Sequence, residues 1–172
     1  MIGELGSFIL VLASFCAVIS FIPIALGAAK QNQFWARLWK PAMLVTFFGF
    51  TTALLLLGYA FLTNDFSIAY VANHSNRSLP DFYKVSAIWG SHEGSMLLWI
   101  WTICAWSLCY GIVSRDDANF KSKVFAAILG IIGLLGLFLI FTSNPFARNL
   151  PFYPLDGKDL NPILQDIGMI FH

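Results

Sequence analysis

The chain has 172 residues, of which 58% are hydrophobic and 11% are charged, and its formal net charge is +1. Soluble globular domains contain about 25% charged residues, so this composition excludes an ordinary soluble domain. The near-neutral charge supplies no basic field, so a nucleic-acid partner is not expected.

Four apolar segments are long enough to cross a bilayer, which takes about 20 residues of helix. They lie at 5–26, 41–62, 88–113 and 124–141, and Pro23 predicts a kink near the end of the first. The first segment lacks the features of a cleaved signal peptide, because Glu4 replaces a basic start and no small-x-small site follows. The sequence therefore predicts an all-α, polytopic membrane protein with four spans and a tail over residues 142–172.

Small residues inside the spans are predicted to serve packing. Gly130, Gly133 and Gly136 in the fourth span would let a neighbouring helix approach closely. The three cysteines lie in apolar segments without a CxxC pair and are predicted to be inert packing or lipid-facing residues. They are Cys16, Cys104 and Cys109.

Lys and Arg residues between the spans predict the orientation of the chain. The first and third loops hold six of these residues, whereas the second loop and the tail hold four. Because loops rich in Lys and Arg stay in the cytoplasm, both termini are expected on the outer side. The six residues are Lys30, Arg37, Lys40, Arg115, Lys121 and Lys123.

The segment WGSHEGSMLLWIW, residues 89–101, places small residues where the third span begins. Gly90 and Gly94 are four positions apart, as are Ser91 and Ser95, so on a helix each pair would share one face. Such small-xxx-small faces favour close contact with another helix. The sequence predicts that Gly90 and Gly94 pack against a neighbouring span.

His92 and Glu93 form an ionisable pair in the same segment. Such a pair is costly at a membrane helix end unless it faces protein, water or a ligand. The physical alternatives are solvation at the interface with packing, or a role as ligand or proton carrier. A zinc protease site is excluded, because Met96 stands where the HExxH motif needs its second histidine.

Tryptophans in and near the third span have two predicted positions. Trp89 lies near the membrane interface, where tryptophan commonly forms an aromatic belt. Trp99 and Trp106 lie seven residues apart and deeper, so they share a face and are predicted to pack against other helices.

The tail after Phe141 is rich in Pro, Asn and Asp, which is typical of an ordered loop outside the bilayer. Asn161 can cap a helix, and Pro162 suits a first helical position. A short helix is therefore predicted over residues 163–172, with Ile163, Ile167 and Ile170 on it. It stops at His172 with no cap, which is typical of a cut or split chain.

Two segments, YKVSAIWGSHEGSMLLWIW and SNPF...DGKDLNPILQDIGMIFH, resemble the amino-terminal part of the CcmF/NrfE family. These proteins are haem lyase subunits of the cytochrome c maturation pathway in bacteria and some mitochondria. The resemblance extends over nearly the whole chain, but the family proteins are several times longer. Their tryptophan-rich WGxxWxWD segment is absent from this sequence, and Ile167 stands where the family pattern has proline.

The resemblance implies a haem-handling role. Family members receive haem from a chaperone and join its vinyl groups to the thiols of a CxxCH motif in apocytochrome c, which a thiol-reducing partner keeps ready. His172 stands at the position of the first of two outer histidines that ligate the incoming haem. The second, and two more that hold a resident haem b, would lie in a carboxy-terminal remainder. The chain alone is therefore expected to bind no haem and to have no lyase activity.

The same resemblance assigns a supporting role to residues at the outer end of the third span. These are Trp89, Gly90, His92, Glu93 and Gly94. It also implies a multi-pass protein of the bacterial inner membrane, with a mitochondrial inner membrane as the alternative. Two other functions stay open from the sequence, a transporter or channel with a polar His-Glu path and a structural scaffold of a membrane complex.

Overall fold

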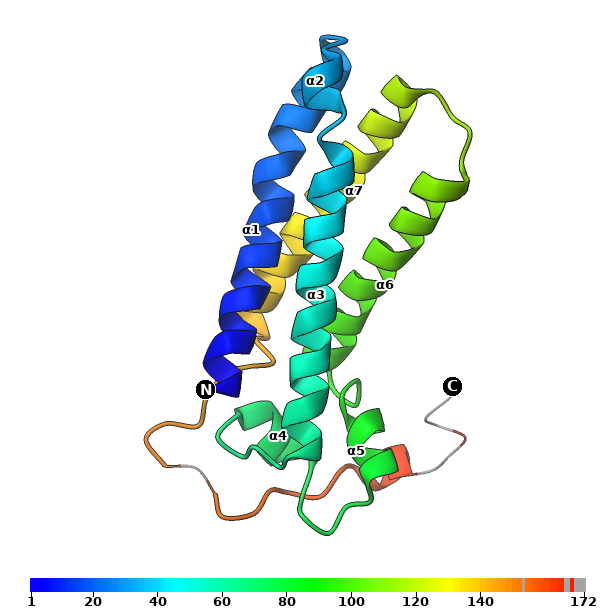
Figure 1. Ribbon diagram of the computed structural model, residues 1–172. Helices are drawn as coiled ribbons and strands as arrows, with labels where there is room; N and C mark the ends of the chain where they lie inside the picture. The colour runs from blue at the N-terminus through cyan, green and yellow to red at the C-terminus, as the bar shows by residue number, and fades with distance from the viewer. Residues whose placement is uncertain (153, 166–167, 169–172) are drawn as a thin grey trace.

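The computed structural model describes residues 1–152, 154–165 and 168, and four long helices dominate it (Figure 1). Each of the four is long and apolar enough to cross a membrane, which confirms the prediction of four long apolar helices as candidate spans. They are α1 (Ile2–Ala29), α3 (Trp39–Leu62), α6 (His92–Val113) and α7 (Ala118–Thr142). The short elements are α2 (Gln33–Ala36), α4 (Ala69–His74), α5 (Asp81–Ala87) and the 3₁₀ helix η1 (Pro162–Gln165).

The third span begins later than predicted. The sequence predicts it from residue 88, but the chain turns between α5 and α6, and α6 begins at His92. The apolar character of residues 85–89 therefore belongs to α5 and to a packed turn rather than to the span. The fourth span, in contrast, extends beyond its predicted start and begins at Ala118, after the N-cap residue Asp117.

The helices α1, α3 and α7 form the tightest part of the bundle. A Cβ atom added at Gly133 of α7 would lie 2.6 Å from Val18 of α1, and one at Gly136 would overlap Ser14. Likewise, a Cβ atom at Gly49 of α3 would lie 2.7 Å from the Cβ atom of Ala13. The prediction that glycines of the fourth span permit close packing is confirmed.

Trp99 and Trp106 of α6 are mostly exposed in the part of the chain that the structure describes, so the helix packing predicted for them is not found there and stays a prediction. They share a face as their spacing predicts, but their exposed fractions are 69% and 71%. The inner face of α6 is instead formed by smaller side chains, because Leu97, Ile100 and Cys104 are fully buried. The three cysteines are unpaired, with Cys104 buried and Cys109 exposed.

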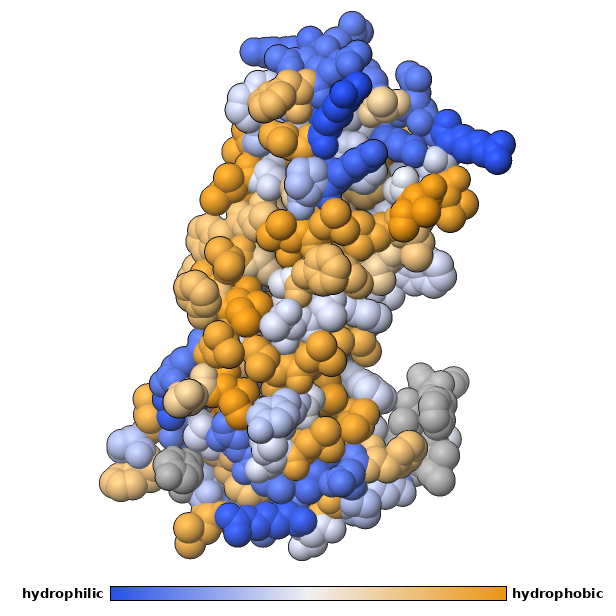
Figure 2. Space-filling model, viewed as in Figure 1, coloured by the Kyte–Doolittle hydropathy of each residue, from blue (hydrophilic) through white to orange (hydrophobic). Residues whose placement is uncertain are grey.

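The two ends of the bundle are formed by different segments of the chain (Figure 1). The N-terminus, α4, α5 and the tail lie at one end, and α2 and the loop from α6 to α7 lie at the other. Hydrophilic residues gather at both ends, and a hydrophobic zone lies between them (Figure 2). This distribution fits a membrane protein, while the side of the membrane on which each end lies stays a prediction.

Candidate functional site

The end of the bundle that carries the N-terminus is covered by a group of short elements that we call the cap. It comprises α4, α5, the turn at residues 88–91 and the described part of the tail, residues 143–152 and 154–165. Both segments that carry the family resemblance contribute to it. The cap is therefore the candidate functional site.

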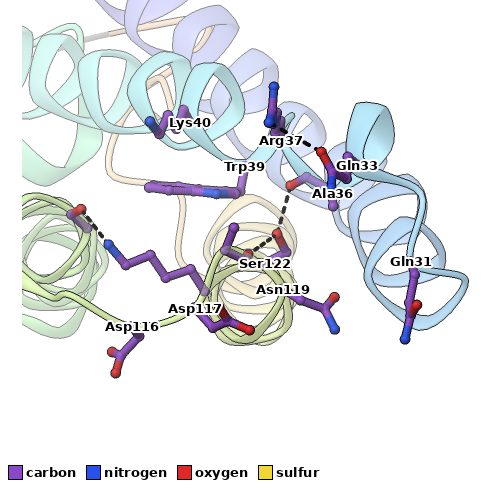
Figure 3. Close-up of a pocket in the computed structure, with 13 residues that line it drawn as sticks. Gln31, Gln33, Ala36, Arg37, Trp39, Lys40, Asp116, Asp117, Asn119 and Ser122 are labelled. Carbon is purple, nitrogen blue, oxygen red and sulfur yellow. Dashed lines mark hydrogen bonds between the residues drawn. The ribbon is translucent and has the colours of Figure 1, made fainter.

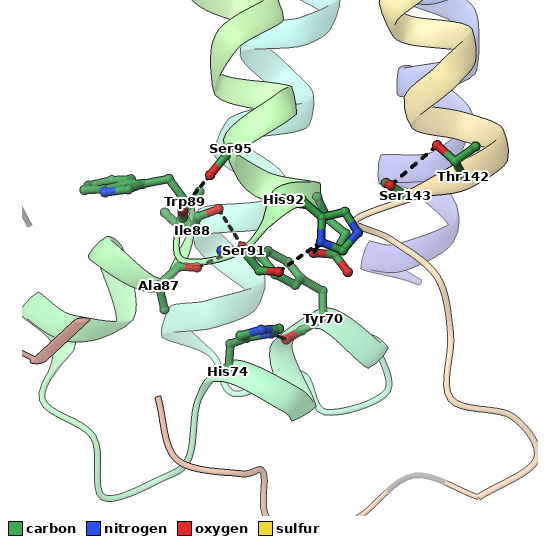
Figure 4. A network of polar contacts seen from close by, with 11 residues as sticks. Tyr70, His74, Ala87, Ile88, Trp89, Ser91, His92, Ser95, Thr142 and Ser143 are labelled. Carbon is green, nitrogen blue, oxygen red and sulfur yellow. Dashed lines mark hydrogen bonds and ion pairs between the residues drawn. The ribbon is translucent and has the colours of Figure 1, made fainter. Parts of the chain in front are cut away.

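The turn between α5 and α6 is held by the side chain of Tyr70 from α4 (Figure 4). The Tyr70 hydroxyl lies 3.0 Å from the carbonyl oxygen of Ile88 and 3.1 Å from that of Ala87, to which it can donate. It also accepts from the backbone N–H of Ser91 at 3.3 Å. Because Tyr70 is 3% exposed, burial raises the pKa of its hydroxyl above the ordinary value and keeps it a donor.

Sequence reasoning missed Tyr70. The signal for it would have been one of two tyrosines in the loop between the second and third spans, which is too little to single out a residue. Its partners are backbone groups, and backbone groups leave no pattern in a sequence.

Gly94 is the residue that the turn requires most strictly. A Cβ atom there would overlap the carbonyl oxygen of Ile88 and lie 2.7 Å from the Tyr70 hydroxyl. One residue on, Ser95 Oγ donates to the carbonyl oxygen of Trp89 at 2.6 Å and so fastens the start of α6 to the turn (Figure 4). Only glycine fits at position 94 without displacing the backbone.

The prediction that Gly90 and Gly94 pack against a neighbouring span is wrong. Gly90 lies in the turn before α6, so the two glycines do not share a helix face. A Cβ atom at Gly90 would meet Leu164 of the tail at 3.0 Å. Both glycines thus serve contacts within the cap, because the helix break at residues 88–91 removes the periodicity that the prediction assumed.

His92 and Glu93 lie in the first turn of α6, and Figure 4 shows His92 beside Ser91. His92 Nδ1 is 3.4 Å from Glu93 Oε2, and this contact is an ion pair only when the imidazole is protonated. The His92 side chain is 70% exposed and that of Glu93 is 22% exposed. A carboxylate at this position interacts favourably with the positive end of the helix dipole. The exposed His92 imidazole fits solvation at a helix end, whereas Glu93 Oε2 is buried and has no hydrogen-bond partner among the described residues.

The tail is bound to the end of α4 by the segment DGKD. Asp156 Oδ1 accepts from the backbone N–H of Arg77 at 3.0 Å, and Asp159 Oδ1 accepts from Asn76 Nδ2 at 2.5 Å. The backbone N–H of Lys158 donates to the carbonyl oxygen of Ala72 at 2.7 Å. These contacts join the tail to residues about 80 positions earlier in the chain.

Further along the tail, Leu160 is fully buried and Leu164 packs against the core. The helix predicted to start at Pro162 does start there, as the 3₁₀ helix η1. Its Leu164 is the side chain that faces Gly90, so the two motif segments are in contact. The rest of the predicted short helix, including His172, lies outside the described residues.

The first part of the tail is fastened to α1. Phe146 is 1% exposed and lies on Gly6, where a Cβ atom would overlap its ring. Arg148 forms an ion pair with Glu4. The backbone N–H of Ala69 donates to the carbonyl oxygen of Ala147 at 2.8 Å, so the same stretch also contacts α4.

Comparison with known protein families supports the resemblance found in the sequence. A sequence profile described as "Cytochrome C assembly protein" matches residues 89–172. The chain is 43% identical to the cytochrome c-type biogenesis protein CcmF of Haemophilus influenzae, with all of the chain and 27% of that protein covered. It is 39% identical to NrfE of the same organism, with all of the chain and 27% of that protein covered.

A solved structure named "Cytochrome c Heme Lyase CcmF" is similar in fold and sequence. It has a TM-score of 0.77 and 25% sequence identity, and the match covers 85% of this chain and 25% of that one. The chain thus spans about a quarter of the length of the relatives that it matches.

Proposed function

This chain belongs to the CcmF/NrfE family of cytochrome c assembly proteins, and we propose that it forms part of a membrane haem lyase. In this role it helps to take haem from a chaperone and supports the covalent attachment of that haem to apocytochrome c. The cap is the region that serves this function. The observation that carries the proposal is the contact between the two motif segments within the cap.

That contact has a direct structural consequence. Leu164 lies on Gly90, and Leu164 precedes His172 by eight residues in the sequence. The tail is also bound at Asp156 and Asp159, so the chain leading to His172 starts from a fixed place. A ligand group is more effective when its supporting residues are held in position. We propose that the turn at residues 88–91 and the DGKD segment together provide this support.

His172 is the proposed axial ligand of haem iron, for which imidazole is suitable. The supporting motif comprises Trp89, Gly90, His92, Glu93 and Gly94, and none of these is assigned a direct catalytic step. Haem is held by axial ligation together with burial of its apolar faces. In the described part of the cap, Phe152 and Leu155 present apolar surface, each 88% exposed. The enclosing surface is proposed to come from the carboxy-terminal remainder of the lyase.

The proposed partners follow from the same reaction. They are the carboxy-terminal remainder, the haem chaperone, apocytochrome c and its thiol-reducing partner. The proposed location is the bacterial inner membrane, with the cap on the extracytoplasmic side, where haem would be delivered.

The experiment is a replacement in cells. This chain would take the place of the matching quarter of a full-length CcmF, in cells without other CcmF or NrfE, and cytochrome c would be measured by haem staining. His172→Ala should lower covalent haem in cytochrome c at least about tenfold, because loss of an axial ligand removes much of the haem affinity. His92→Gln is the comparison variant and should lower maturation less than His172→Ala, since His92 belongs to the supporting motif and is not the proposed axial ligand.

The amount of each variant in the membrane must be measured in parallel. Normal maturation by His172→Ala at an equal membrane level would show that the ligand assignment is wrong. Equal loss in both histidine variants would instead assign the motif itself to haem.

The alternative of a transporter with a polar path gains no support from the geometry. The pair His92–Glu93 lies at the first turn of α6 rather than along the span. Support for the transporter function would require flux of an ion or solute through the purified chain.

A further inference from the structure

The end of the bundle opposite the cap contains a hollow of about 810 Å³ (Figure 3). It lies between α2 and the start of α3 on one side and the start of α7 on the other. The Trp39 indole extends into it and is stacked on Phe125 at a centroid distance of 3.9 Å. Binding pockets for small molecules commonly measure about 300–1,000 Å³, so the hollow can hold a ligand of moderate size.

One side of the hollow is basic. Arg37 and Lys40 lie on the same side of the Trp39 indole (Figure 3). Arg37 donates to Gln33 Oε1 at 3.3 Å, and Lys40 Nζ lies 5.6 Å from the centre of the Trp39 ring. Neither cation forms an ion pair with a residue that the structure describes. Both charges remain available to an anionic group.

The other side of the hollow is acidic. Asp116, Asp117 and Asn119 lie across the indole from the two cations (Figure 3). Asp116 is already engaged, because it accepts from the Tyr110 hydroxyl at 2.8 Å and from Ser114 Oγ. Asp117, in contrast, forms no ion pair within the described residues. The hollow therefore separates charges of opposite sign that do not neutralise one another.

The surroundings of the hollow place it at the level of a membrane interface. Phe34 and Trp35 of α2 are 70% and 45% exposed, and Phe120 at the start of α7 is 54% exposed. Exposed aromatic side chains at the end of a span are typical of the head-group region. Lys121 also lines the hollow, and its Nζ donates to the carbonyl oxygen of Ser114 at 2.6 Å.

We propose that this hollow binds the phosphoethanolamine head group of a membrane phospholipid. Its phosphate would lie against Arg37 and Lys40, and its primary ammonium would lie against Asp117. Basic pockets between membrane helices are known sites for phosphate-bearing head groups. The acidic side adds a feature that a purely anionic lipid would not use, and it favours a head group that carries both charges. This site is at the opposite end of the bundle from the cap and does not depend on the proposed function.

The test is lipid binding to the purified chain in mild detergent, followed by native mass spectrometry. The probes are phosphatidylethanolamine, phosphatidylcholine and phosphatidylglycerol with identical acyl chains. Phosphatidylethanolamine should be retained about fivefold more tightly than phosphatidylcholine, whose methylated ammonium cannot donate hydrogen bonds to Asp117. Lys40→Gln should weaken both about fivefold, and Asp117→Asn should remove the difference between them. Lys123→Gln, an exposed change outside the hollow, is the matched control and should have no effect.

Each variant must first show a wild-type helical spectrum and thermal transition. Equal retention of all three lipids, unchanged by Lys40→Gln and Asp117→Asn, would overturn the site. If phosphatidylglycerol binds most tightly of the three lipids and Asp117→Asn leaves its binding unchanged, the choice of head group is wrong. Soluble phosphoethanolamine that binds as tightly as the lipid would overturn the assignment to a membrane lipid.

Discussion

The two ends of this bundle differ in how their parts are joined. At the cap, side chains and backbone groups connect segments that are about 80 residues apart, as with Asn76 and Asp159. At the opposite end, in the part of the chain that the structure describes, one side-chain hydrogen bond connects α2 with the start of α7, from Ser122 Oγ to the carbonyl oxygen of Ala36 at 3.1 Å. Charged groups at that end face a hollow without pairing across it.

This difference indicates separate tasks for the two ends. The cap fixes the backbone of both motif segments, which suits a platform for a ligand that arrives from outside the chain. The end opposite the cap keeps charged side chains unpaired. Unpaired charges suit a binding site in which the ligand supplies the opposite charges. Substitutions that target backbone fit should therefore be most damaging at the cap.

The largest effect is expected for Gly94→Ala. The added Cβ atom would overlap the Ile88 carbonyl oxygen, which cannot move without opening the turn. Overpacking of this kind costs about 3 kcal/mol or more. The measurement is thermal unfolding in detergent together with the level of protein in the membrane.

Gly58→Ala is the matched control for this change. Its Cβ atom would meet only the flexible end of the Ile88 side chain, at 3.2 Å. It should cost less than about 1 kcal/mol, because alanine also favours the helix over glycine. Equal stability of the two variants would mean that the turn is not as tightly built as the structure indicates.

The next effect is expected for Tyr70→Phe. Removing the hydroxyl leaves the Ser91 N–H and the two carbonyl oxygens of the turn without this partner. An unsatisfied buried polar group costs about 1–3 kcal/mol, so the free energy of unfolding should fall by that amount. Tyr59→Phe, at an exposed tyrosine of α3, should leave it unchanged.

The same residue gives a pH dependence with a definite sign. The pKa of Tyr70 is raised in the folded state by burial, so its neutral form stabilises the fold. This contribution is fully present below the ordinary tyrosine pKa of about 10 and is lost as the pH rises above it. The stability difference between wild type and Tyr70→Phe should therefore shrink above about pH 10, and a constant difference would contradict the assignment.

The sequence predicted the spans well and the cap poorly, for a physical reason. Length and apolar content identify α1, α3, α6 and α7, since a bilayer imposes both. The contacts of Gly94 and Tyr70 depend on a turn whose partners are backbone carbonyl groups, and no residue pattern records them. The position of Pro162 was predicted correctly because it depends on its own backbone geometry. His172 stays a prediction.

A smaller effect is expected in the tail for Asp156→Ala. It removes the acceptor for the N–H groups of Arg77 and Gly157, so the free energy of unfolding should fall by about 1 kcal/mol. Hydrogen exchange at Arg77 and Lys158 should become faster while the spans stay protected. Lys158→Ala is the control, because Lys158 contributes its backbone N–H rather than its side chain. Unchanged exchange in Asp156→Ala would mean that the tail is held mainly by Leu160 and Leu164.

The smallest structural effect, and the sharpest test of the two ends, is expected from single cysteines at their surfaces. Ser78 at the cap and Ala118 at the opposite end are both exposed, whereas Ser122 and Ser143 are too buried to label, at 1% and 8% exposure. In cells with an intact membrane, an impermeant thiol reagent should modify Ser78→Cys, and it should modify Ala118→Cys only after permeabilisation. Replacing Cys16, Cys104 and Cys109 by alanine removes background labelling, and both variants should keep wild-type stability, since neither site is packed.

The expected labelling of the two cysteines would follow from the six Lys and Arg residues of the first and third loops, which favour the cytoplasm. The reverse pattern would place the cap, and with it the segment that leads to His172, on the wrong side for extracytoplasmic haem.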